Sequence, residues 1–203
     1  MDFELIKRHI DPVSCLDIGA NSGAWHNEAR LHWPNAYFFL IEANPECAEA
    51  IAQTGASHRI TALSDCEKDV TFYTRKDAPG CTGCSYKKEV GTPFYEGEKA
   101  VPHIIRTQRL DDVVEGMPFQ LIKIDTQGSE LEILRGGLNT LASAKAVVME
   151  LSLTIYNEGS PLADEQIEFM ASQGFYLAEK LGTISRCIEP FDPIQEDALF
   201  LRK

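Results

Sequence analysis

The amino-acid sequence predicts one three-layer α/β domain with a doubly wound, mostly parallel sheet, and three observations predict it. Apolar runs of strand length alternate with polar, helix-compatible segments along the chain. The run at 37–41, Tyr-Phe-Phe-Leu-Ile, is unbroken, as in a parallel strand that is buried on both faces. A strand at 14–18 leads through a glycine-containing turn into a helix at 24–32, which is the first step of a ligand-binding α/β unit.

The other expected elements follow the same hydrophobic patterning. In chain order they are a short helix at 3–10, a strand at 36–42, a helix at 46–53, a strand at 58–63, an alternating edge strand or hairpin at 70–74, a short strand at 104–107, a small helix at 109–114, a strand that ends at Asp125 and a helix that follows the turn at 126–128, a strand at 145–151, a helix at 161–173, strands at 175–181 and 197–201, and between these two a candidate strand at 185–188.

Length and composition limit the class of protein. A chain of 203 residues holds one α/β domain with a core (1–203) and hardly two, and its 44% hydrophobic and 25% charged residues are typical of a soluble globular protein. The net charge of −12, with scattered basic residues, argues against a nucleic-acid partner. No apolar run is long enough for membrane insertion, and residues 1–8 lack a secretory apolar core. We therefore expect a cytoplasmic protein whose cysteines are reduced thiols.

The motif Asp17-Ile18-Gly19-Ala20-Asn21-Ser22-Gly23 forms the predicted turn after the first strand. Gly19 and Gly23 allow backbone angles or close approaches that a side chain would forbid, and the turn presents N–H groups to a ligand. Asn21 stands where a dinucleotide fingerprint has its second glycine, which favours a nucleoside ligand without a diphosphate. The alternative is an ordinary βα turn with two glycines.

Acidic residues stand at the predicted carboxyl ends of several strands. Glu42 follows the glycine turn by about 20 residues, the interval at which an acid accepts hydrogen bonds from ribose hydroxyls. Asp65 follows the third strand, where it is either an adenine-binding acid or a turn-forming residue. Asp125 and Glu150 end two further strands at the same sheet edge, where doubly wound sheets bind ligands. Lys123 lies on the same strand face as Asp125 and is placed to pair with it.

Residues 76–102 lack a regular pattern and are punctuated by proline and glycine. A segment of this kind inside a compact domain is often a functional loop, and we expect it to bind the acceptor substrate. Cys81 and Cys84 form a C-x-x-C pair, which supplies only half of a zinc site even if His103 were a third ligand. Nothing in the sequence requires a metal ion.

Two stretches together resemble the FkbM-type family of S-adenosylmethionine-dependent methyltransferases. They are residues 16–23, with the glycine turn, and residues 122–136, with the pattern K-x-D-x-x-G-x-E. Residues 62–65, 109–111 and 197–200 fit the same outline. The resemblance covers about residues 14–203 and is weakest across 76–102.

The resemblance implies a Rossmann-like class I methyltransferase sheet of seven strands, with the last strand antiparallel. It also implies methylation of a hydroxyl oxygen, on a sugar, glycolipid or natural product. By motif, the residues expected at the methionine part of S-adenosylmethionine are Asp17, Gly19, Asn21 and Gly23. Glu42 is expected at the ribose, Asp65 at the adenine and Asp125 beside the methyl-donor end.

A hydroxyl acceptor gains from a base that takes its proton as the new bond forms. Asp125 is the first candidate for this base or for orienting the acceptor, followed by Glu130 and Glu150. Glu130 has a structural alternative, because an acid in the first turn of a helix is favoured by the helix dipole.

Two other functions stay open on the sequence. A non-catalytic nucleotide- or cofactor-binding module would keep the turn and Glu42 but lack an acceptor pocket. An NAD-dependent oxidoreductase is disfavoured by Asn21 and by the lack of room for a second domain. A lid over the cofactor would come from the central loop or from a second subunit, so a homo-oligomer is one expectation.

Overall fold

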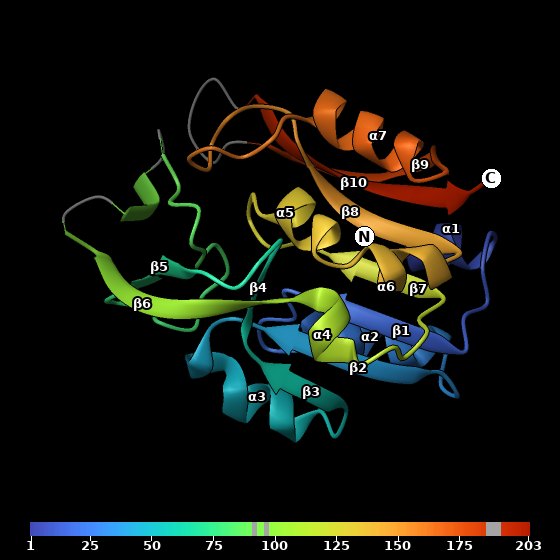
Figure 1. Cartoon of the computed structure of the whole chain (residues 1–203), viewed down its shortest axis with the longest axis horizontal. Helices are drawn as coiled ribbons and strands as arrows, with labels where there is room; N and C mark the ends of the chain where they lie inside the picture. Colours follow the sequence, from blue (N-terminus) through green and yellow to red (C-terminus); the bar gives the residue numbers. More distant parts are fainter. Residues whose placement is uncertain (91–92, 96–97, 186–191) are drawn as a thin grey trace.

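A seven-stranded sheet with the strand order β3-β2-β1-β7-β8-β10-β9 forms the centre of the fold (Figure 1). The structure is a computed structural model that describes residues 1–90, 93–95, 98–185 and 192–203. In chain order the elements are α1 (Phe3–Lys7), β1 (Ser14–Ile18), α2 (Ala24–His32), β2 (Tyr37–Glu42), η1 (Pro45–Cys47), α3 (Ala48–Gln53), β3 (Ser57–Ile60), β4 (Ala62–Ser64), β5 (Asp69–Arg75), η2 (Pro93–Tyr95), β6 (Ala100–Arg109), α4 (Leu110–Val114), β7 (Leu121–Ile124), α5 (Glu130–Arg135), α6 (Leu138–Ser143), β8 (Ala146–Ser152), α7 (Ala163–Ser172), β9 (Phe175–Ser185) and β10 (Pro193–Arg202).

The sheet has the predicted doubly wound arrangement. Strands β3, β2, β1, β7 and β8 pair in parallel, whereas β10 pairs antiparallel with both β8 and β9. The last strand is therefore inserted antiparallel between its two neighbours. The expectation of seven mostly parallel strands with an antiparallel last strand is confirmed.

Helices cover both faces of this sheet, so the fold has three layers. On one face, Ile124 of β7 packs in a core with Leu134 of α5 and other residues of α4–α7. On the opposite face, Leu121 of β7 packs in a second core with Ala29 of α2 and Ile51 of α3. Because side chains alternate along a strand, Lys123 points to the face of the second core.

A second, three-stranded sheet with the order β4-β6-β5 extends to the left of the main sheet in Figure 1. It arises because the strand predicted at 58–63 is two strands. β3 ends at Ile60 and pairs with β2, while β4 pairs in parallel with residues 107–109 of β6. The expectation of a single strand at 58–63 is wrong, because residues 62–64 pair with residues 107–109 and not with the main sheet.

Most other differences are extensions of predicted elements. The short strand expected at 104–107 is the long strand β6, which pairs antiparallel with β5 as a hairpin-like ribbon. The strand expected at 175–181 continues to Ser185, so the candidate strand at 185–188 begins within β9, and its positions 186–188 lie outside the described residues. Within the described part of the chain, every helix is too short or too polar to span a bilayer.

Candidate active site

The turn after β1 depends on residues with left-handed backbone angles. Gly19 has φ +77°, Gly23 has φ +80° and Asn21 has φ +49°. A Cβ atom on Gly19 would collide with the carbonyl oxygen of Asp125, because the turn passes directly against the end of β7. The backbone N–H of Gly19 also donates to the carbonyl of Ile41 at 2.9 Å. The turn thus joins the ends of β1, β2 and β7.

Glu42, the last residue of β2, holds this turn from the other side. Its Oε2 accepts a hydrogen bond from the backbone N–H of Asn21, and its Oε1 accepts one from the N–H of Asn44, both at 2.7 Å. Burial raises the pKa of the Glu42 carboxyl above its ordinary value, and the N–H groups of Asn44 and Asn21 oppose the rise. A carboxylate has about four lone-pair positions, so Glu42 keeps acceptor capacity for hydroxyl groups of a ligand.

The side chains of the same two asparagines hold the central segment over the turn. Asn21 donates from Nδ2 to the carbonyl of Gly80 at 3.2 Å, and Asn44 donates from Nδ2 to the carbonyl of Pro79 at 2.7 Å. We call these two contacts the asparagine latch. The latch brings the residues that follow Gly80 to the edge of the site.

Lys123 lies between two carboxylates at the centre of the sheet edge. Its Nζ is 3.3 Å from Oδ1 of the fully buried Asp17 and 3.5 Å from Oδ2 of Asp125, and it donates to the carbonyl of Gly19 at 3.2 Å. Burial alone would lower the pKa of the Lys123 ammonium, but the attraction of Asp17 and Asp125 outweighs it and raises that pKa. The expected pair of Lys123 with Asp125 is confirmed.

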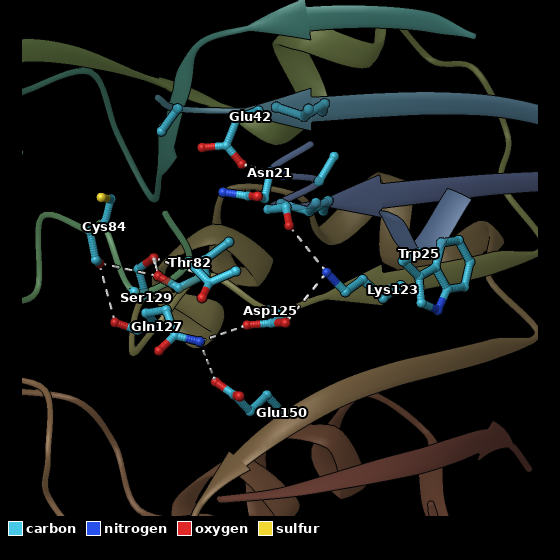
Figure 2. Close-up of a pocket in the computed structure, with 18 of the residues that line it drawn as sticks. Asn21, Trp25, Glu42, Thr82, Cys84, Lys123, Asp125, Gln127, Ser129 and Glu150 are labelled. Atoms are coloured by element: carbon cyan, nitrogen blue, oxygen red, sulfur yellow. Dashed lines mark hydrogen bonds and ion pairs between the residues drawn. The ribbon is translucent and has the colours of Figure 1, made fainter. Parts of the chain in front are cut away.

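Gln127 connects Asp125 to Glu150, as Figure 2 shows. Its Nε2 donates to Oδ1 of Asp125 at 2.9 Å and to Oε2 of Glu150 at 3.0 Å. Its Oε1 accepts from the hydroxyl of Tyr156 at 3.0 Å, and that hydroxyl is also in hydrogen-bond contact with Gln195. Gln127 has φ +58°, a left-handed backbone conformation that is uncommon for a residue other than glycine.

Three carboxylates form a row across neighbouring strands. Glu150 of β8 pairs in register with Asp197 of β10, and Asp125 follows directly after β7 on the other side of β8. Burial raises the pKa of Glu150 well above its ordinary value, and the charges of Asp125 and Glu130 raise it further. Burial and the charge of Asp125 also raise the pKa of Asp197. The row therefore favours a cation or hydrogen-bond donors from a ligand.

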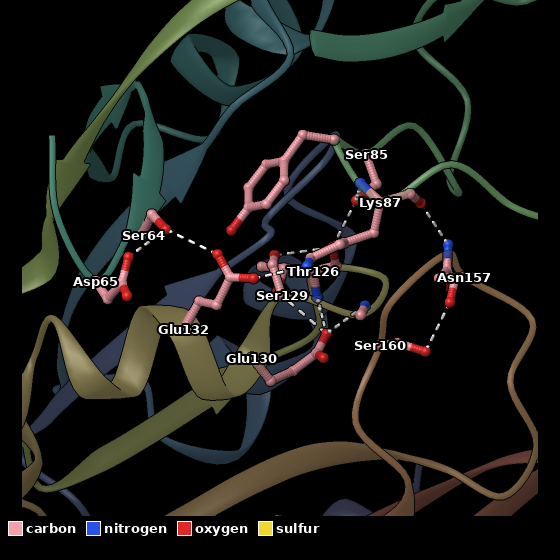
Figure 3. Close-up of polar contacts among 12 residues, drawn as sticks. Ser64, Asp65, Ser85, Lys87, Thr126, Ser129, Glu130, Glu132, Asn157 and Ser160 are labelled. Atoms are coloured by element: carbon pink, nitrogen blue, oxygen red, sulfur yellow. Dashed lines mark hydrogen bonds and ion pairs between the residues drawn. The ribbon is translucent and has the colours of Figure 1, made fainter. Parts of the chain in front are cut away.

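Glu130 has a structural position in the turn between β7 and α5 (Figure 3). Its Oε1 accepts from the backbone N–H of Thr126 at 2.8 Å, from the Thr126 hydroxyl at 3.1 Å and from the N–H of Gly128 at 3.1 Å. Its side chain is almost completely buried and does not line the cavity described below. These contacts favour the structural alternative for Glu130 over a base.

Residues 85–87 are fixed to the same turn (Figure 3). The hydroxyl of Ser85 donates to the carbonyls of Thr126 and Gln127, both at 3.2 Å. The ammonium of Lys87 lies 2.6 Å from a carboxylate oxygen of Glu132, on the first turn of α5. The segment after the asparagine latch is therefore held at both of its ends.

A cavity of about 320 Å³ lies where the two turns and this segment meet. On one side it is lined by the glycine turn and the end of β2, and on the other by residues of β8, β9 and β10. Among its lining residues are Gly19, Ala20, Asn21, Trp25, Glu42, Cys81, Thr82, Cys84, Ser85, Tyr86, Lys123, Asp125, Gln127, Glu150, Ile184 and Asp197. Part of the irregular segment 76–102 thus lines the same cavity as the strand-end acids.

Some predicted site residues are not on this lining. Asp17 and Gly23 support the glycine turn from behind. Asp65 is exposed, and its carboxylate lies 3.1 Å from the ammonium of Lys68, away from the cavity. The adenine role of Asp65 stays a prediction that its position does not support.

The C-x-x-C pair lines the cavity but has few candidate metal-binding neighbours. The sulfur atoms of Cys81 and Cys84 are 3.8 Å apart, and burial raises the pKa of Cys84 to about 12. Nε2 of His103 instead lies 2.9 Å from the hydroxyl of Thr74. Over the ranges that the structure describes, no three His, Cys, Asp or Glu residues are grouped so that they could hold a metal ion.

Sequence reasoning missed three contributors to the site. Gln127 lies between Asp125 and Glu130 in the predicted turn at 126–128, and this position is the only sign in the sequence that it belongs to the site. Tyr156 and Gln195 reach the site from a loop and from β10, so no local pattern marks them.

Solved structures of similar fold include methyltransferases and a protein of pre-rRNA processing. They include precorrin-6y C5,15-methyltransferase of Geobacter metallireducens GS-15, with 14% identity over 98% of this chain and 86% of that one and a TM-score of 0.53. A TehB-like SAM-dependent methyltransferase of Corynebacterium glutamicum has 11% identity over 98% and 85%, with a TM-score of 0.50. The fibrillarin pre-rRNA processing protein of Methanococcus jannaschii has 12% identity over 95% and 67%, with a TM-score of 0.55. Identities this low show a common fold.

The sheet order, the antiparallel β10 and the cavity at the strand ends define the fold of a class I S-adenosylmethionine-dependent methyltransferase. No curated protein sequence matches the chain. The family model of the methyltransferase FkbM domain matches residues 17–177, and the chain belongs to that family.

Proposed function

We propose that this protein binds S-adenosylmethionine and transfers its methyl group to a hydroxyl oxygen of a small molecule or glycan, such as a sugar, glycolipid or natural product. The observation that carries this proposal is one cavity lined both by the glycine turn with Glu42 and by the row of strand-end carboxylates. A non-catalytic binding module would need only the first of these two ends.

The cavity residues suit an adenosyl cofactor. Glu42 would accept hydrogen bonds from the ribose hydroxyls through its remaining lone pairs, and Gly19 and Asn21 would border the methionine part. The cavity volume lies near the lower end of the range of about 300–1,000 Å³ for small-ligand sites. Acidic side chains around it favour a sulfonium cation over the neutral product.

When bound, S-adenosylmethionine supplies an activated methyl group on a positively charged sulfur. The protein would hold the acceptor oxygen in line with the methyl–sulfur bond and keep water out, and such orientation contributes up to about 7–11 kcal/mol in favourable cases. Asp125 would accept the hydroxyl proton as the oxygen–carbon bond forms and the carbon–sulfur bond breaks. Its side chain is 36% exposed, which leaves it accessible to an acceptor.

The cofactor assignment is tested by calorimetric titration with S-adenosylmethionine, S-adenosylhomocysteine and, as a control, NAD. We expect micromolar binding of both adenosyl ligands and none of NAD. Absence of adenosyl binding in protein that circular dichroism shows to be folded would refute the proposal, and selective NAD binding would favour an oxidoreductase.

The acceptor class is tested with S-adenosylmethionine labelled in its methyl group. Neutral sugars and polyols are compared with matched amines, and mass spectrometry locates the label on oxygen or nitrogen. With the best acceptor, Asp125→Asn should lower kcat by about 10²–10⁴-fold, the usual contribution of a general base. The exposed Asp164→Asn is the matched control. Transfer only to amines would contradict the hydroxyl assignment.

A further inference from the structure

Among the residues the structure describes, Gln127 is the one side chain that donates hydrogen bonds to both Asp125 and Glu150. Both of its amide protons are used, one for Oδ1 of Asp125 and one for Oε2 of Glu150. Because an ionised carboxylate only accepts hydrogen bonds, the contact with Asp125 fixes which end of the amide is nitrogen. Its oxygen is in turn held by the hydroxyl of Tyr156. Both protons and the oxygen of the Gln127 amide therefore have a hydrogen-bond partner.

The backbone of Gln127 is also held in an unfavourable conformation. A residue with a Cβ atom at φ +58° costs roughly 1–2 kcal/mol, so surrounding contacts must maintain it. The Ser85 hydroxyl bonds the Gln127 carbonyl, and Gly128 packs so closely on Ser160 and Asn157 that a Cβ there would be in conflict with them. The turn thus aims the Gln127 side chain into the cavity at an energetic cost.

The two carboxylates that share this amide differ in their surroundings. Asp125 is partly exposed and has the Lys123 ammonium 3.5 Å from its Oδ2. Glu150 is 5% exposed, and its Oε2 lies 3.3 Å from the Tyr156 hydroxyl and 3.0 Å from the Gln127 amide. A protonated Glu150 could donate to the Tyr156 oxygen and still accept from Gln127. The geometry therefore suits a neutral Glu150 behind a charged Asp125.

Resting on the methyl transfer proposed above, we infer that Gln127 is the positioning residue of the site, which holds Asp125 toward the acceptor and is itself supported from behind by a proton-bearing Glu150. The inference selects Asp125 over Glu150 as the carboxylate that meets the acceptor. The other charged groups that face this pair are Lys123 on β7, Asp17 on β1, Glu130 on α5 and Asp197 on β10. None of them bridges the two carboxylates by hydrogen bonds.

The first test needs no acceptor and follows the titration of Glu150. Glutamate labelled with ¹³C at the carboxyl carbon is incorporated, and the Glu150 signal is identified as the one missing in Glu150→Gln. In Gln127→Asn the shorter side chain cannot reach Glu150, while asparagine tolerates the left-handed backbone. The loss of an N–H donor to the charged form should raise the Glu150 midpoint by about one pH unit or more.

The exposed Gln53→Asn is the matched control and should leave the Glu150 midpoint unchanged. An unchanged midpoint in Gln127→Asn would overturn the inference, because a merely structural glutamine would not move it. Binding of S-adenosylhomocysteine to the wild type is measured on the same samples. Its absence would refute the methyltransferase proposal while the titration still reported on the Gln127 bridge, so the two failures are distinguishable.

The second test uses methyl transfer to the acceptor found in the screen. Gln127→Asn should lower kcat about 10- to 100-fold, with a smaller change in KM, because a misplaced base costs mainly the chemical step. Glu150→Gln, which can reproduce a protonated carboxyl, should retain far more activity than Asp125→Asn. Equal losses in Glu150→Gln and Asp125→Asn would overturn the inference.

Discussion

The carboxylate of Glu42 accepts a 2.7 Å hydrogen bond from the backbone N–H of Asn21. This contact joins the end of β2 to the turn after β1, and both elements line the same cavity. A strand-end acid that was expected to bind a ribose therefore also shapes the loop beside it. Its substitution should affect the ligand site in two ways at once.

Glu42→Gln should weaken binding of S-adenosylhomocysteine by about 10- to 100-fold, because hydrogen bonds to a charged group contribute about 1.5–3 kcal/mol. The introduced amide also turns an N–H donor toward the N–H of Asn21 or Asn44, which should disturb the turn. Calorimetry measures the affinity. The exposed Glu46→Gln is the control, and equal affinities of both variants would contradict the assignment of Glu42.

Gly19→Ala should destabilise the fold more than Gly116→Ala. Both glycines have similar left-handed angles, φ +77° and +78°, but a Cβ at Gly116 meets open space whereas one at Gly19 meets the Asp125 carbonyl. Gly116→Ala should therefore show only the conformational cost of about 1–2 kcal/mol. Chemical denaturation gives both values, and similar losses would mean that the close approach of the turn to β7 is unimportant.

Local signals explain which parts of the fold could be predicted. The bounds of β1 and α2 agree with the predicted 14–18 and 24–32, because an apolar run and a glycine turn mark them in adjacent residues. The split between β3 and β4 could not be predicted, since it depends on pairing with residues 107–109. The position of Asp65 away from the cavity is a consequence of this split, because the strand before it leaves the main sheet.

The site divides in the same way. The predicted residues Gly19, Asn21, Glu42, Asp125 and Glu150 line the cavity, because the carboxyl ends of parallel strands meet at one sheet edge. The links between these residues come from long-range contacts. Tyr156 reaches Gln127 from a loop far along the chain, and no spacing in the sequence records this contact.

Asn44→Ser should loosen the segment around Pro79 without removing the helix cap. Asn44 Oδ1 accepts from the N–H of Glu46, and serine is an equally good capping residue. Serine is too short to reach the Pro79 carbonyl, so half of the asparagine latch is lost. A hydrogen bond contributes about 1 kcal/mol, which predicts roughly fivefold faster amide hydrogen exchange over residues 80–86. The exposed Asn139→Ser is the control, and unchanged exchange would show that the latch does not hold the segment.

Lys123→Met should be strongly destabilising, because it leaves the buried Asp17 without its cation. Removing one partner of a buried pair costs about 3–5 kcal/mol. The remaining Asp17 would bind a proton in the folded state more readily than in the unfolded state, so the loss should be larger at pH 8 than at pH 5. Urea unfolding at both pH values tests this expectation, and Asp17→Asn/Lys123→Met should recover part of the stability. A pH-independent loss would argue against the charge pair.

Glu150→Gln should change how stability depends on pH. Burial, with the charges of Asp125 and Glu130, raises the folded-state pKa of Glu150 above its ordinary value of 4.5. At a pH between the pKa of Glu150 in the unfolded chain and its pKa in the folded protein, the folded protein binds the proton and the unfolded chain does not. Glu150 therefore contributes less stability as pH rises. The free energy of unfolding of Glu150→Gln minus that of the wild type should therefore grow from pH 5 to pH 8, by on the order of 1 kcal/mol. Unfolding in urea at several pH values measures this difference, with the exposed Glu158→Gln as a control whose difference should stay flat. A constant or shrinking difference for Glu150→Gln would show that Glu150 is ionised throughout this pH range. The proposed distinction between a charged Asp125 and a protonated Glu150 would then be wrong.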